Sequence, residues 1–171
     1  LSGIKENYET VLIHDLGSGL VVDRKFLEIN HIDIFNNETS VQNSLDDGSD
    51  LVMFSGDKLF GSVQSGIIAG KNKLIENIKN YSLFRTYRCS PLTLFELQKT
   101  ATSYINKDEL NIPFWHLISQ SYQSLEIRIK NIVSESSFEF DIQEGTSLIG
   151  GGTLPGVTMK SPVLLIKEEA S

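Results

Sequence analysis

A strand–helix–strand pattern in the first third of the chain constrains the fold more than any other feature of the sequence. Residues 10–19, TVLIHDLGSG, form an apolar run that ends in glycine and serine, which is typical of a buried parallel strand. Residues 39–48, TSVQNSLDDG, predict a short helix, and residues 50–54, DLVMF, predict the next strand. If the two strands are neighbours in one sheet, the helical crossover makes them parallel. The pattern therefore predicts an α/β fold.

Polar side chains follow both predicted strands at the same edge of that sheet. Asp15 lies at the end of the first strand, and Ser55 and Lys58 follow the second. Open α/β sheets bind ligands at the C-terminal ends of their strands, and a partly desolvated lysine can act as nucleophile or base. Pyridoxal phosphate (PLP) needs a Schiff-base lysine, an acidic partner for its pyridine nitrogen, and hydroxyl donors for its phosphate. Lys58, Asp15 and Ser55 match these roles. The alternative is an ion pair of Lys58 with Asp15 or Asp57, which the spacing by itself favours.

The character of the sequence changes near residues 71–90, from alternating strands and helices to longer helices followed by strands. Residues 20–37, between the first strand and the first helix, are expected to be mixed in structure, with a turn at FNNE. The further expected elements are strands at 65–70, 138–142 and 161–167, helices at 72–80, 91–106 and 114–135, and a glycine-rich loop at 148–156.

Composition and charge limit which partners the protein can bind and where in the cell it is expected. The chain has 171 residues, about the length of one domain. Its 22 acidic and 15 basic residues give a net charge of -7, which argues against broad nucleic-acid binding. A local basic site remains possible. No apolar run approaches the roughly 20 residues of a membrane span, and LSGIKENYET lacks the apolar core of a signal peptide. With a single cysteine, Cys89, we expect a cytoplasmic protein without a membrane partner. The absence of an initiator methionine suggests a fragment of a longer chain.

Several conspicuous residues are given structural roles. His14 precedes Asp15 on a strand, so its side chain is expected on the opposite face as a packed or hydrogen-bonded histidine. Cys89 is expected to be a buried thiol, and Phe114 and Trp115 to be packing anchors. No metal site is predicted, because the other histidines lack ligands at suitable spacing. The glycine-rich loop lacks the context of a P-loop.

Four segments resemble a known family in order and spacing. They read DLGSG, DLVMFSGDKLFGSVQSGIIAGKNKLI, LFRTYRCSPLTLFEL and GGGTLPG. Together they resemble bacterial selenocysteine synthase, the L-seryl-tRNA(Sec) selenium transferase, over nearly the whole chain. This resemblance implies the aspartate-aminotransferase fold type, with residues 1–80 as the C-terminal part of the PLP-binding large domain. Residues 81–171 would then form a small α+β domain, itself incomplete.

The resemblance also implies an activity and a role for each site residue. The activity is conversion of seryl-tRNA(Sec) to selenocysteinyl-tRNA(Sec) with selenophosphate, through a dehydroalanyl intermediate. Lys58 maps onto the family's PLP lysine, Asp15 onto the partner of the pyridine nitrogen, and Asp57 onto an active-site aspartate near a subunit contact. Arg85 and Arg88 map onto two arginines that hold the selenium donor, which suits guanidinium chemistry. A dimer-based homo-oligomer is implied as well.

The sequence departs from the family pattern beside the expected site. Ser62 and Val63 replace a glycine and a proline, and Ser90 and Pro91 replace an acidic residue and a lysine. Family members are also much longer, so this chain alone is expected to be inactive. Two alternatives therefore stay open. One is a related PLP lyase or transferase acting on a small amino acid or sugar acid, and the other is a non-catalytic fragment that retains assembly surfaces.

Overall fold

The computed structural model describes residues 3, 10–134, 139–150, 154 and 156–166. It divides into two compact units, Leu1–His116 and Leu117–Ser171, which are described separately. The predicted boundary after residue 80 concerns the family's large and small domains, and it stays a prediction. Within the described ranges, no helix combines the length and the apolar character needed to cross a bilayer.

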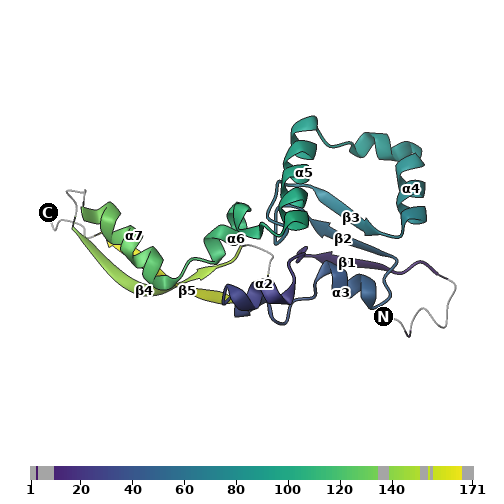
Figure 1. The fold of residues 1–171 in the computed structure, drawn as a ribbon. Helices are drawn as coiled ribbons and strands as arrows, with labels where there is room; N and C mark the ends of the chain where they lie inside the picture. Colours follow the sequence, from purple (N-terminus) through teal and green to yellow (C-terminus); the bar gives the residue numbers. More distant parts are fainter. Residues whose placement is uncertain (1–2, 4–9, 135–138, 151–153, 155, 167–171) are drawn as a thin grey trace. The chain divides into compact units, whose positions relative to one another are not determined.

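The first unit is built on a three-stranded sheet with β2 in the centre (Figure 1). Strand β1 pairs with β2 in parallel, and β2 pairs with β3 antiparallel. The parallel pair confirms the predicted crossover, and the mixed α/β character confirms the coarse fold class. The elements are β1 (Ile13–Gly17), α2 (Arg24–Ile29), η1 (Asp33–Phe35), α3 (Val41–Asp46), β2 (Leu51–Ser55), β3 (Gly66–Gly70), α4 (Asn72–Asn80), η2 (Ser82–Tyr87), α5 (Pro91–Asn106), η3 (Glu109–Asn111) and α6 (Pro113–Ile118).

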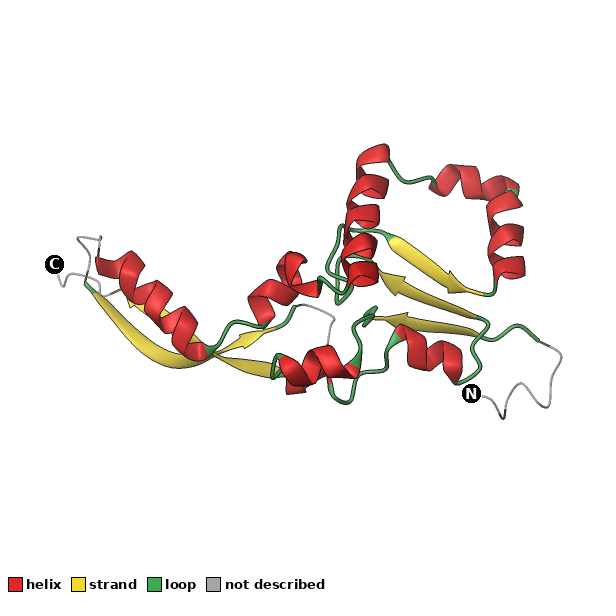
Figure 2. Cartoon of the chain, viewed as in Figure 1, coloured by secondary structure: helices red, strands yellow, loops and turns green. Residues whose placement is uncertain are grey.

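Helix starts in this unit follow the capping chemistry of the sequence. Ser40 caps α3 and accepts a hydrogen bond from the Asn43 amide (3.0 Å). Ser90 caps α5, and Pro91 occupies its first turn. Figure 2 shows α4 and α5 standing at opposite ends of β3, with η2 between them.

The expectation of mixed structure over residues 20–37 missed a helix. Asp23 caps α2 by accepting a hydrogen bond from the Phe26 amide (2.8 Å), and η1 follows. The signal was present in the sequence, because Asp23 directly precedes a segment with apolar residues at helical spacing.

Two buried clusters hold the first unit together. One lies between the sheet and α3 and contains Val41, Val52, Phe54 and Phe60. The other surrounds Trp115, which is fully buried and makes edge-on contacts with Phe26 and Phe35 (ring centroids 5.5 Å apart in both pairs). The expectation that Trp115 anchors packing is confirmed.

The second unit packs helix α7 (Tyr122–Ser134) against the hairpin of β4 (Phe140–Leu148) and β5 (Thr158–Ile166). The hairpin strands are antiparallel, and Lys160 forms an ion pair with Glu144 (2.9 Å). Both strands extend beyond the predicted ranges, while residues 138 and 167 and residues 151–153 and 155 of the predicted glycine-rich loop lie outside the described residues.

The single helix predicted over residues 114–135 is wrong, because α6 ends at Ile118 and α7 begins at Tyr122. The serine hydroxyl of Ser121 accepts a hydrogen bond from the Ser124 amide (3.1 Å) and starts a new helix. Serine side chains compete in this way with helical hydrogen bonds, so the apolar spacing alone did not reveal the break.

Candidate functional site

The C-terminal ends of β1 and β2 are joined by a backbone hydrogen bond. The Leu59 amide in the loop after β2 donates to the Ser18 carbonyl in the loop after β1 (2.9 Å). The Ser18 hydroxyl donates to the Glu38 carboxylate, so it is already engaged within the chain. The two strand ends therefore form one edge, as the sequence predicted.

The alternation of side chains along the strands places Asp15 and Ser55 on one face of the sheet. His14 lies on the other face, where Nδ1 is 2.6 Å from the Ser44 hydroxyl of α3, and Val52 and Phe54 are buried there. Asp15 pairs in register with Met53, two residues before Ser55, so these three share the face opposite α3. The expectation of a hydrogen-bonded His14 is confirmed.

The Lys58 amine lies against the end of β1. A Cβ built on Gly17 would lie 3.8 Å from Lys58 Nζ, which places the amine two residues beyond Asp15. Gly17 has a φ of 68°, a left-handed conformation that glycine adopts readily. Among the described residues, Lys58 forms no ion pair with Asp15 or Asp57, so the alternative of such a pair is not observed.

The loop that carries Lys58 is tightly closed. The Gly61 amide donates to the Lys58 carbonyl (2.9 Å), and the Ser62 amide donates to the Gly56 carbonyl (2.8 Å). Gly56 is buried, and a Cβ there would lie only 2.7 Å from the Val63 carbonyl oxygen. Asp57 is exposed, whereas Lys58 and Ser55 are half-buried.

Residues far along the chain support this loop, and sequence reasoning missed them. The Tyr104 hydroxyl of α5 donates to the Phe60 carbonyl (2.9 Å) and accepts from Trp115 Nε1 (2.8 Å). Thr100 Oγ1 lies 3.0 Å from the Ser62 hydroxyl. Burial raises the pKa of Tyr104 well above its ordinary value, an effect that the Trp115 hydrogen bond only partly offsets. The helical spacing of Thr100 and Tyr104 was visible, but their partners about 40 residues earlier were not.

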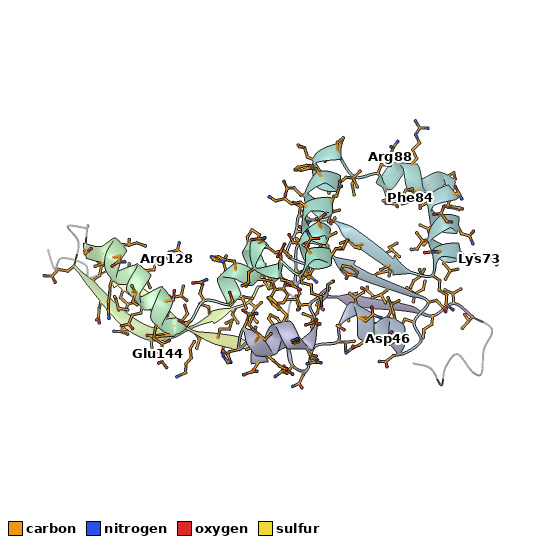
Figure 3. The ribbon with its side chains drawn as sticks, in the orientation of Figure 1. Asp46, Lys73, Phe84, Arg88, Arg128 and Glu144 are labelled. Carbon is orange, nitrogen blue, oxygen red and sulfur yellow. The ribbon has the colours of Figure 1, made fainter. Side chains whose placement is uncertain are left out.

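The two predicted arginines come from the segment between α4 and α5, not from the Lys58 loop. Arg85 belongs to η2 and Arg88 follows it, and both side chains are exposed. Figure 3 shows Phe84 and Arg88 on the segment between α4 and α5. Arg88 lines an apolar groove of about 740 Å³ that also includes Gly66 and Ile68 of β3. No described interaction joins either arginine to Lys58.

Cys89 also lines this groove and is exposed, so the prediction of a buried thiol is wrong. The cysteine follows η2, in a segment whose residues from Tyr81 to Ser90 are all exposed. Among the described residues, no three His, Cys, Asp or Glu side chains gather as metal ligands would.

The donor set at the sheet edge suits PLP in two respects. An amine and a carboxylate lie at the end of the same strand, and a half-buried hydroxyl at Ser55 shares the carboxylate's face. The glycine beneath Lys58 Nζ leaves room that a side chain would occupy. The residues present therefore fit this cofactor.

Comparison with known proteins agrees with the sequence motifs. The family model for L-seryl-tRNA selenium transferase matches residues 1–171. The L-seryl-tRNA(Sec) selenium transferase of Clostridium botulinum (strain Loch Maree / Type A3) is 36% identical over 96% of this chain and 36% of its own length. The proteins of the same name from Campylobacter fetus and Clostridium perfringens are each 35% identical, over 92% and 93% of this chain and 34% and 35% of their own lengths. The chain thus spans about a third of the length of these curated relatives. On this family match and these identities, the chain belongs to the L-seryl-tRNA selenium transferase family.

Proposed function

We propose that this chain carries the cofactor lysine of a PLP-dependent enzyme that converts seryl-tRNA(Sec) to selenocysteinyl-tRNA(Sec) with selenophosphate. One observation carries the proposal: Lys58 Nζ lies against Gly17 at the end of the strand that also bears Asp15. The names of the relatives support the substrate class, because each is called an L-seryl-tRNA(Sec) selenium transferase. The proposed location is the cytoplasm, and the proposed assembly is a dimer-based homo-oligomer.

The side chains have distinct proposed roles. When bound, PLP supplies an electron sink that stabilises negative charge at the serine Cα. Lys58 would hold the cofactor covalently and, once released, take the Cα proton at Nζ. The Asp15 carboxylate would hold a proton on the pyridine nitrogen, and Ser55 would donate to the phosphate. Asp57, exposed beside Lys58, is the further active-site carboxylate.

Arg85 and Arg88 are proposed to bind the anionic selenium donor. Both guanidiniums are exposed and make no described ion pair, so their hydrogen-bond donors are available to an oxyanion. In the domain division proposed for the family, residues 1–80 belong to the large domain and residues 81–171 to the small one. The lysine and the arginines would then come from different domains.

The first test replaces the lysine in the full-length protein. Lys58→Ala should abolish borohydride-dependent attachment of PLP, detected by peptide mass spectrometry, and should lower selenocysteinyl-tRNA formation by several orders of magnitude. The matched control is Lys73→Ala, an exposed lysine on α4 (Figure 3), which should leave both unchanged. Normal turnover by Lys58→Ala, or attachment of PLP at another lysine, would refute the assignment.

A further inference from the structure

Helix α5 presents two hydroxyls to the Lys58 loop. Thr100 and Tyr104 are four residues apart, so they lie on one face of the helix. Thr100 is buried, and its Oγ1 lies 3.0 Å from Ser62 Oγ and 3.0 Å from its own helix carbonyl at Glu96. Tyr104 donates to the Phe60 carbonyl (2.9 Å). Both contacts fall within four residues of Lys58.

The Tyr104 hydroxyl is engaged both as a donor and as an acceptor. Its proton goes to the Phe60 carbonyl, and it accepts from Nε1 of Trp115, which is fully buried (2.8 Å). Its ring packs on the Phe60 ring with centroids 5.3 Å apart. A tyrosine hydroxyl is protonated over the physiological pH range, and burial raises the pKa of Tyr104 further, so this hydroxyl remains a donor to the loop.

The backbone of the loop links these contacts to the position of Lys58. Phe60 and Ser62 belong to the turn closed by the Gly61–Lys58 and Ser62–Gly56 backbone hydrogen bonds. The next residue after Lys58, Leu59, is fully buried and is bonded to the end of β1 through the Ser18 carbonyl. A shift of the turn away from α5 would therefore move the base of the Lys58 side chain relative to Gly17.

We propose that Thr100 and Tyr104 are positioning residues, which hold the 56–62 loop against α5 and so keep the Lys58 amine at the end of β1. This inference rests on the proposed function, in which Lys58 is the cofactor lysine. Neither residue is proposed to touch substrate or cofactor. Both act through the loop backbone and Ser62.

The test measures the loop directly in the full-length protein without added cofactor. In Tyr104→Phe, amide hydrogen exchange of residues 56–62 should be roughly three- to tenfold faster, as expected for loss of the hydrogen bond from the hydroxyl to the Phe60 carbonyl. Exchange of residues 51–54 in β2 should stay unchanged, whereas a general loss of stability would accelerate both segments. Thr100→Val should produce the same pattern with a smaller change.

A second readout follows the lysine itself. With PLP added, the pH midpoint of the visible absorbance of the lysine-linked cofactor should shift in both variants, because a looser turn alters the surroundings of the amine. Thr102→Val removes an exposed hydroxyl bonded only to the Gln98 carbonyl of the same helix (2.8 Å), and Tyr122→Phe alters the other unit. Both controls should leave loop exchange and midpoint unchanged.

The outcomes separate the two proposals. Unchanged loop exchange in Tyr104→Phe and Thr100→Val would overturn the positioning role, and so would equal acceleration of β2. If Tyr104→Phe does not fold, Thr100→Val decides by the same criteria. Failure of PLP to attach to Lys58 in the unaltered protein would instead refute the proposed function, while the exchange measurements would still report whether α5 holds the loop.

Discussion

The Lys58 loop and the Arg85–Arg88 segment are both parts of the candidate site, yet they are built in opposite ways. The loop is closed by backbone hydrogen bonds, backed by buried Leu59 and Phe60, and contacted by α5. The arginine segment begins in the 3-10 helix η2 and continues past its end to Arg88, with every residue exposed, beside an apolar groove. The first unit therefore fixes the lysine by its own contacts but does not fix the arginines.

The largest effect on folding is expected for Gly56→Ala in the loop. The new methyl group would lie 2.7 Å from the Val63 carbonyl oxygen and also against the Ser65 hydroxyl, so the turn must shift. Overpacking of this kind costs about 1–3 kcal/mol of unfolding free energy. Urea unfolding of the full-length protein would measure it.

Gly66→Ala is the matched control, because a Cβ at Gly66 has no atom within 4 Å. Its unfolding free energy should change by no more than about 0.5 kcal/mol. Equal unfolding free energies of Gly56→Ala and Gly66→Ala would show that close packing does not constrain the conformation of the Lys58 loop. The loop would then not differ in this respect from the arginine segment.

An intermediate effect is expected at alkaline pH. The folded state keeps Tyr104 protonated above the ordinary tyrosine pKa of 10.0, whereas the unfolded state releases this proton. Stability contributed by Tyr104 is therefore fully present below pH 10.0 and falls above it, by about 1.4 kcal/mol per pH unit for one proton.

Unfolding titrations between neutral pH and strongly alkaline pH would measure this slope. Tyr104→Phe should reduce it, while Tyr87→Phe, which alters an exposed side chain in the arginine segment, should not. An unaltered slope in Tyr104→Phe would mean that burial of this hydroxyl does not contribute to the alkaline loss.

The smallest effect on folding is expected for Arg85→Ala and Arg88→Ala. Each should change the unfolding free energy by less than about 0.5 kcal/mol, because exposed side chains without partners contribute little. The KM for the selenium donor should nevertheless rise roughly tenfold to a hundredfold, the value of a charged hydrogen bond of about 1.5–3 kcal/mol.

Arg128→Ala on α7 (Figure 3) is the control arginine and should change neither quantity. A loss of stability in Arg88→Ala comparable to that of Gly56→Ala would show that the segment is packed after all. An unchanged donor KM would remove the arginines from the proposed site.

Periodicity and motif order determined a good part of this protein in advance. The apolar runs before DLGSG and SGDK predicted two parallel strands with Asp15 and Lys58 at one edge, since side-chain alternation and crossover rules act locally. The helices predicted over residues 39–48 and 91–106 are present as α3 and α5. The four quoted motifs predicted the family, which the comparisons confirm.

Tertiary structure alone decided how the lysine is held. Sequence cannot show that the Tyr104 hydroxyl meets a carbonyl 44 residues earlier, or that Thr100 meets Ser62, because such contacts depend on how α5 packs on the sheet. The tertiary structure also decides that Cys89 is exposed and that the helix expected over residues 114–135 is divided into α6 and α7. In each case the deciding interaction is a contact or a solvent exposure that local periodicity does not encode.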